Sequence, residues 1–136
     1  MKLSAVDAKD LTVLAALLQD ALVLIDDIAY FPEEGKFVLV ANRFQWEIDR
    51  AGATDHSRTT TGVTFSKVTA VKRRGLDLRD GDGMLSLLTI TAEPGAVQLT
   101  FSGDAAIRLE VSEILCHLQD VGESWPTKWR PDHASA

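Results

Sequence analysis

The sequence contains a single cysteine, Cys116, and this scarcity restricts how the chain can be stabilised. One cysteine cannot form an intrachain disulfide, so stability must come from a hydrophobic core, as is usual in a reducing compartment such as the cytoplasm. The neighbours Ile114, Leu115 and Leu118 are apolar, which predicts a buried thiol.

Long hydrophobic runs are also missing. The first ten residues lack the apolar segment of a signal peptide, and the apolar stretch that follows is interrupted by Gln19, Asp20, Asp26 and Asp27. We therefore expect neither a signal peptide nor a membrane span, and we predict a cytoplasmic protein.

Basic residues are outnumbered, with 14 Lys and Arg against 20 Asp and Glu and a formal net charge of −6. Such a surface repels phosphate backbones and anionic lipid headgroups. The charge balance thus argues against nucleic acid or a membrane surface as the partner.

Complete catalytic and metal-binding motifs are lacking as well. The sequence has no Gly-x-Ser-x-Gly turn, no phosphate-binding glycine loop and no Gly-x-Gly-x-x-Gly. Residues 80–83 resemble part of a calcium loop, but Leu78 and Thr89 occupy positions where carboxylates belong. The three histidines are scattered, and Cys116 and His117 would point about 100° apart on a helix. We predict no catalytic residue, no metal and no cofactor.

The composition is that of an ordinary globular domain, with 46% hydrophobic and 25% charged residues in 136 positions. This length is enough to bury a sizeable core. We predict one domain over residues 1–136, either a monomer or a homodimer.

The clearest strand is Gly35–Asp49. Side chains alternate between the two faces of a strand. One face carries an apolar set, which we predict to be the core face of a central strand. The opposite face begins apolar and then carries Arg43, Gln45 and Glu47, which predicts a solvated end. The predicted core set is Val38, Val40, Phe44, Trp46 and Ile48.

Helices are predicted at both ends of the sheet. Asp7 and Asp10 resemble a capping box before leucines at helical spacing, which predicts a helix over about 8 to 20. Ser112 is a plausible N-cap for a second helix, with Ile114, Leu115, Leu118 and Val121 on one face and Gly122 at its end.

The remaining segments alternate as strands and turns. The pattern predicts a strand over residues 22–31, a turn over 32–35 and the longest loop over 50–62. It predicts a further strand over 63–71 with a β-bulge or a sharp bend at Ser66–Lys67, and a three-stranded meander over 84–111. The tail 123–136 has two prolines and two tryptophans, so we expect it to be extended and packed on the body.

Together these elements predict an α+β fold. We expect a curled antiparallel sheet of about six strands with N- and C-terminal helices. Two arrangements stay open, a pleckstrin-homology-like roll and a flatter α+β sandwich.

Several segments together resemble a known family. They are Asn42–Glu47, Leu88–Ile90, Leu99–Gly103, Leu118–Asp120, and Gly122 followed by Trp125, Pro131 and His133. This combination resembles the domain of unknown function 2948 family of alphaproteobacteria over nearly the whole chain. The resemblance implies a single cytoplasmic domain with no assigned activity, and it carries over no catalytic or binding residue.

Two surfaces are candidate binding sites. Arg43 and Glu47 share one strand face and could line a groove, or they could form a solvated face with weak ion pairs. Lys72, Arg73 and Arg74 form a local positive patch with Lys67 and Arg79. This patch could bind an acidic protein or a phosphate, or be a solvated turn.

We therefore carry two hypotheses of function. The favoured one is a non-enzymatic adaptor that binds an acidic protein partner through one of these surfaces. The alternative is a small-molecule-binding protein or hydrolase with a pocket under the 50–62 loop.

Overall fold

The computed structural model describes residues 1–44, 56–76 and 83–127. Within these ranges the chain forms nine β-strands and one α-helix. They are β1 (Lys2–Ala5), α1 (Ala8–Leu17), β2 (Ala21–Phe31), β3 (Lys36–Phe44), β4 (His56–Phe65), β5 (Val68–Arg74), β6 (Met84–Glu93), β7 (Ala96–Phe101), β8 (Ala106–Val111) and β9 (Cys116–Thr127).

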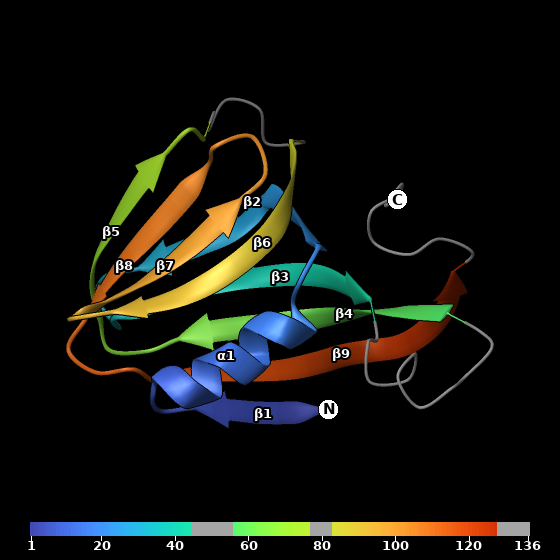
Figure 1. Cartoon of the computed structure of the whole chain (residues 1–136), viewed down its shortest axis with the longest axis horizontal. Coiled ribbons are helices and arrows are strands. Elements are labelled where there is room, and N and C mark those ends of the chain that lie inside the picture. Colours follow the sequence, from blue (N-terminus) through green and yellow to red (C-terminus); the bar gives the residue numbers. More distant parts are fainter. Residues whose placement is uncertain (45–55, 77–82, 128–136) are drawn as a thin grey trace.

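The nine strands form one antiparallel sheet in the order β1-β9-β4-β3-β2-β6-β7-β8-β5. The sheet curls into two layers, with β5 to β8 in the upper part of the view and β3, β4, β9 and β1 in the lower part (Figure 1). Strand β2 joins the layers, because its first residues pair with both β3 and β6. The chain turns sharply between β4 and β5, where Lys67 has a φ of 59°. This confirms the predicted bend.

Helix α1 packs against β6 and β1 and covers the core. Asp7 is its N-cap, since the Asp7 carboxylate accepts a hydrogen bond from the Asp10 backbone N–H at 2.8 Å. Leu11, Leu14 and Leu18 are buried in the core. The predicted N-terminal helix is confirmed in type and start. No helix in the described ranges is long and apolar enough to cross a bilayer.

The core lies between the two layers and includes side chains from both. Buried and partly buried residues alternate along β7 from Val97 and along β8 from Ile107. Their inward residues Val97, Leu99, Ile107 and Leu109 are fully buried, which confirms the predicted meander. Phe37 and Phe65 pair across β3 and β4 with ring centroids 6.4 Å apart.

The predicted six-stranded α+β fold is wrong, because the sheet has nine strands and residues 116–127 form β9 instead of a C-terminal helix. Cys116 and Leu118 are buried while His117 and Gln119 are exposed, which is the period of a strand. Strand β9 pairs with β4 on one side and β1 on the other. These long-range pairings outweigh the local helical spacing.

Of the predicted core set of the central strand, Phe44 is buried as expected, but the two faces of the strand before it are assigned the wrong way round. Phe37, Leu39 and Ala41 face the core and are at most 1% exposed, whereas Val40 on the opposite face is 36% exposed. Both faces of this segment are apolar, so alternation alone does not reveal which one is buried. Trp46 and Ile48 lie outside the described residues.

The predicted 50–62 loop is largely strand, since β4 begins at His56 and pairs with β3 through residues 58–65. The first residues of the predicted loop, 50–55, lie outside the described ranges. Of the predicted extended tail, residues 123–127 belong to β9, and residues 128–136 lie outside the described ranges.

Candidate functional site

The predicted Arg43 and Glu47 surface does not form as expected. Arg43 is 0% exposed and points into the core side of β3, so it cannot line an open groove. Glu47 lies outside the described residues. The expectation of a solvated Arg43 is therefore wrong.

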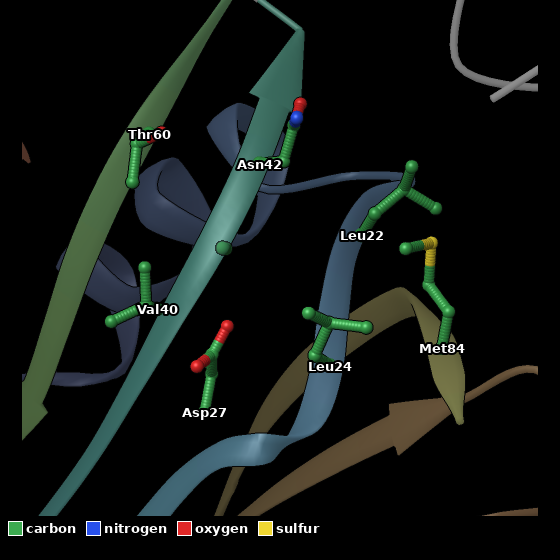
Figure 2. Close-up of a pocket in the computed structure, with 8 residues that line it drawn as sticks. Leu22, Leu24, Asp27, Val40, Asn42, Thr60 and Met84 are labelled. Carbon is green, nitrogen blue, oxygen red and sulfur yellow. The ribbon is translucent and has the colours of Figure 1, made fainter. Parts of the chain in front are cut away.

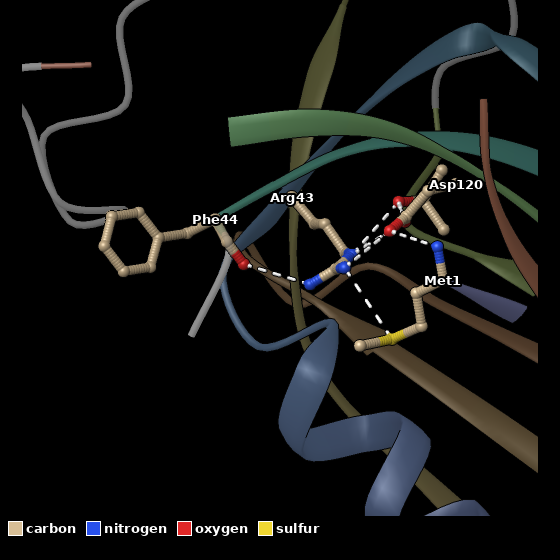
Figure 3. A network of polar contacts seen from close by, with 5 residues as sticks. Met1, Arg43, Phe44 and Asp120 are labelled. Atoms are coloured by element: carbon tan, nitrogen blue, oxygen red, sulfur yellow. Dashed lines mark hydrogen bonds and ion pairs between the residues drawn. The ribbon is translucent and has the colours of Figure 1, made fainter. Parts of the chain in front are cut away.

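Arg43 instead belongs to a partly buried polar cluster with Thr61, Asp120 and Met1, which we call the Arg43 cluster (Figure 3). Its Nη2 donates to Asp120 Oδ2 at 2.9 Å, and its Nε lies 3.1 Å from both Asp120 Oδ1 and Thr61 Oγ1. The Thr61 hydroxyl donates to Asp120 Oδ1 at 2.6 Å, and the Met1 amine lies 3.3 Å from Asp120 Oδ2. Two parallel N–H···O bonds of this kind are the strong form of an arginine–carboxylate pair.

Electrostatics in the Arg43 cluster favour a charged carboxylate. Burial would raise the pKa of Asp120, but hydrogen bonds from Arg43 and Thr61 and the Arg43 charge outweigh it and lower the pKa. The cluster links β3, β4 and β9 with Met1, the residue before β1. Since the guanidinium is buried and engaged, we interpret the cluster as structural.

The predicted basic residues Lys72, Arg73 and Arg74 are brought together at the end of β5, and we call them the basic edge. All three side chains are exposed. They line a shallow hollow of about 180 Å³ together with Gln98, Ala106 and Arg108. Lys72 and Gln98 both lie opposite Arg108 in the pairing of β5, β8 and β7, so the basic face continues inward from the edge.

Ion pairs neutralise part of this surface. Lys72 Nζ lies 3.1 Å from Glu110, and Arg108 Nη1 lies 2.9 Å from Glu93. Within the described part of the chain, neither Arg73 nor Arg74 has an ion-pair partner. Two guanidinium groups are therefore available to an incoming anion. Of the other predicted patch residues, Lys67 is exposed at the turn before β5, and Arg79 lies outside the described ranges.

A second hollow, which we call the outer hollow, lies on the sheet face turned away from the core (Figure 2). It has a volume of about 230 Å³ and combines a carboxylate, an amide and a hydroxyl with apolar walls. Its lining residues are Leu22, Leu24, Asp27, Val40, Ala41, Asn42, Thr60 and Met84. Sequence reasoning missed this site because Leu22, Val40 and Thr60 belong to three different segments.

Comparison with known proteins assigns the chain to a family. The family model for the protein of unknown function DUF2948 matches residues 1–133. The chain belongs to the DUF2948 family. No curated protein and no solved structure matches this DUF2948 chain.

The thiol of this DUF2948 protein is poorly suited to nucleophilic chemistry. Cys116 is 0% exposed, and burial raises the pKa of its thiol to about 12. The thiolate is the reactive form of cysteine, so it is scarce at neutral pH. Among the described residues, no group of three His, Cys, Asp or Glu side chains is arranged to hold a metal ion.

Proposed function

We propose that this DUF2948 protein is a non-enzymatic adaptor that binds an acidic, extended segment of a protein partner along β5. The observation that carries the proposal is the position of the basic edge. Strand β5 is the last strand of the sheet and pairs only with β8 among the described strands. An added strand would therefore have backbone groups to pair with.

Side-chain geometry supports an acidic partner. Successive residues of a strand point to opposite faces, so Arg73 points to the face opposite Lys72 and Arg74. An extended segment with acidic residues at neighbouring positions could therefore meet positive charge on either face. Charge-assisted hydrogen bonds from arginine to carboxylate are about twice as strong as neutral ones.

Positive charge on an edge strand also has a protective effect. Lysine and arginine at such positions hinder the pairing of two copies of the same chain. The same charges would repel a second basic edge and attract an acidic segment, so the two effects share one cause. A binding experiment separates the two roles, because only a binding surface would hold an acidic peptide.

The experiment measures binding of a short fluorescent peptide that alternates Glu and Val, with a Gln-Val peptide as the uncharged control. We expect the acidic peptide to bind at low salt and to shift the β5 backbone amide resonances. The variant Arg73→Glu with Arg74→Glu should weaken binding by at least about tenfold, and the difference should shrink near 1 M salt as the Debye length falls to about 3 Å.

A matched control reverses two other exposed lysines, as Lys9→Glu with Lys36→Glu. This variant changes the net charge equally but leaves β5 intact, so it should bind much as wild type does. Equal weakening in both variants would mean that only net charge matters. Failure of wild type to bind the acidic peptide better than the Gln-Val peptide would overturn the proposal.

One observation favours the alternative, a small-molecule-binding protein. Thr60, within the segment first predicted as a loop, lines the outer hollow. Hydrolysis is less well supported there, because among the described lining residues the Thr60 hydroxyl has no histidine beside it to activate it as a nucleophile.

A further inference from the structure

The outer hollow is created by an irregularity in β2. Val23 pairs with Ala41 and Ile28 with Leu39, so four residues of β2 lie opposite Val40 alone. Bulges of this kind bend the strand and redirect its side chains, and they are common beside functional sites. Here the bulge carries β2 away from β3 and leaves a space between them.

The walls of the space are apolar. Leu22 and Met84 point toward each other on one side, and Leu24 and Val40 lie on the two strands that flank the opening (Figure 2). Val40 is 36% exposed and Met84 is 43% exposed. A ligand with an apolar body would remove this surface from water, at about 25 cal/mol per Å² buried.

A carboxylate projects into the same space. Asp27 lies in the bulge and points between Val40 and Leu24 (Figure 2). Among the described residues, no hydrogen bond or ion pair engages this carboxylate. Asp27 is exposed, so its carboxylate is open to a positive group from solvent, and a ligand that covers the hollow would displace part of the water that screens this attraction.

The other end of the hollow has a fixed polar group. Arg58 donates from Nε to Asn42 Oδ1 at 2.5 Å and from Nη2 to the Asn42 carbonyl oxygen at 2.9 Å. Because Arg58 only donates, these bonds fix Asn42 Oδ1 as the acceptor and leave its Nδ2 group as a donor. Arg58 is 5% exposed, so the amide is held by a buried side chain.

We propose that the outer hollow binds a small protonated amine with an apolar body. The ammonium group pairs with Asp27, the hydrocarbon lies on Leu22, Leu24, Val40 and Met84, and the Asn42 and Thr60 end accommodates a polar terminus. The volume of about 230 Å³ is below the roughly 300–1,000 Å³ of sites for drug-sized ligands, so the occupant must be small. This proposal develops the small-molecule alternative and is independent of the basic edge.

The test compares three probes of similar size and different charge, n-hexylamine, n-hexanol and hexanoate, at neutral pH. Binding is measured by calorimetry and by NMR shifts of the Met84 methyl and Thr60 amide groups. We expect hexylamine to bind most tightly, hexanol to bind at least about tenfold more weakly, and hexanoate to show no measurable binding. Equal binding of hexylamine and hexanol, or no binding of hexylamine, would overturn the proposal.

The matched variants are Asp27→Asn and Asp26→Asn, which remove the same charge from adjacent exposed positions, of which only Asp27 lines the hollow. We expect Asp27→Asn to weaken hexylamine binding by about tenfold or more and Asp26→Asn to leave it within about twofold. Equal effects would show that only the general charge of the bulge matters. Both variants should bind the acidic Glu-Val peptide like wild type, so failure of one proposal is distinguishable from failure of the other.

Discussion

Two ion pairs of this protein have the same length and very different surroundings, and they allow a direct test of the Arg43 cluster. Arg43 and Asp120 lie 2.9 Å apart with side chains 0% and 12% exposed. Arg108 and Glu93 also lie 2.9 Å apart, but both side chains are 36% exposed. The perturbation is Asp120→Asn, with Glu93→Gln as the matched control.

The expected magnitudes follow from the environments. At 2.9 Å, Coulomb attraction is about 6 kcal/mol for an effective dielectric constant near 20, but only about 1.4 kcal/mol in bulk water. Asp120→Asn leaves the buried Arg43 without this counterion, and removing one partner of a buried pair costs about 3 to 5 kcal/mol. Since Asn keeps one hydrogen-bond acceptor, we expect Asp120→Asn to lower the free energy of unfolding by about 3 kcal/mol, the lower end of this range. Glu93→Gln should cost at most about 1 kcal/mol.

Urea denaturation provides the assay, with the free energy of unfolding taken at unchanged m value. A third variant, Arg43→Met with Asp120→Leu, replaces both charges by apolar groups and should recover much of the loss, because such replacements in buried pairs are often neutral or stabilising. Equal and small losses for Asp120→Asn and Glu93→Gln would refute the reasoning. That result would mean that the Arg43 charge is stabilised without Asp120.

Three further predictions concern stability and accessibility. Because its pKa is lowered on folding, ionised Asp120 stabilises the folded state above its unfolded pKa, near 4, and this stabilisation is lost as the pH falls through the folded pKa. The free energy of unfolding of Asp120→Asn should therefore fall less steeply with pH below about pH 4 than that of wild type. The Cys116 thiol, with a pKa of about 12, should react with iodoacetamide in step with urea unfolding, and rapid labelling of the folded protein would contradict its burial. Gly75→Ala should lower the free energy of unfolding clearly more than Gly103→Ala in the same melts. Both glycines have a φ above 70°, but a Cβ at Gly75 would lie 2.9 Å from the Asp104 carbonyl oxygen, whereas a Cβ at Gly103 would have no described atom within 4 Å. Equal losses of stability in the two variants would mean that the contact with Asp104 has no effect and that only the backbone strain common to both positions matters.

Local sequence determined the elements whose signals are short-range. The N-cap of α1 needs only Asp7 and the backbone N–H three residues later. The meander of β7 and β8 shows a clean alternation, with one apolar and one polar face, so its inward residues follow from the sequence. The turn at Gly35 is equally local, because its φ of 63° suits glycine best.

Tertiary structure decided the features that depend on distant partners. Residues 113–121 have a spacing that suits a helix, but residues 116–121 become part of β9 because β1 and β4 supply backbone partners on both sides. Arg43 has the sequence signature of a solvated residue, and it is buried because Asp120, 77 positions later, compensates its charge. The outer hollow likewise exists only where the β2 bulge separates two strands. Burial of a charge and the opening of a space both depend on which segments meet, and a single sequence does not contain that pairing in any local pattern.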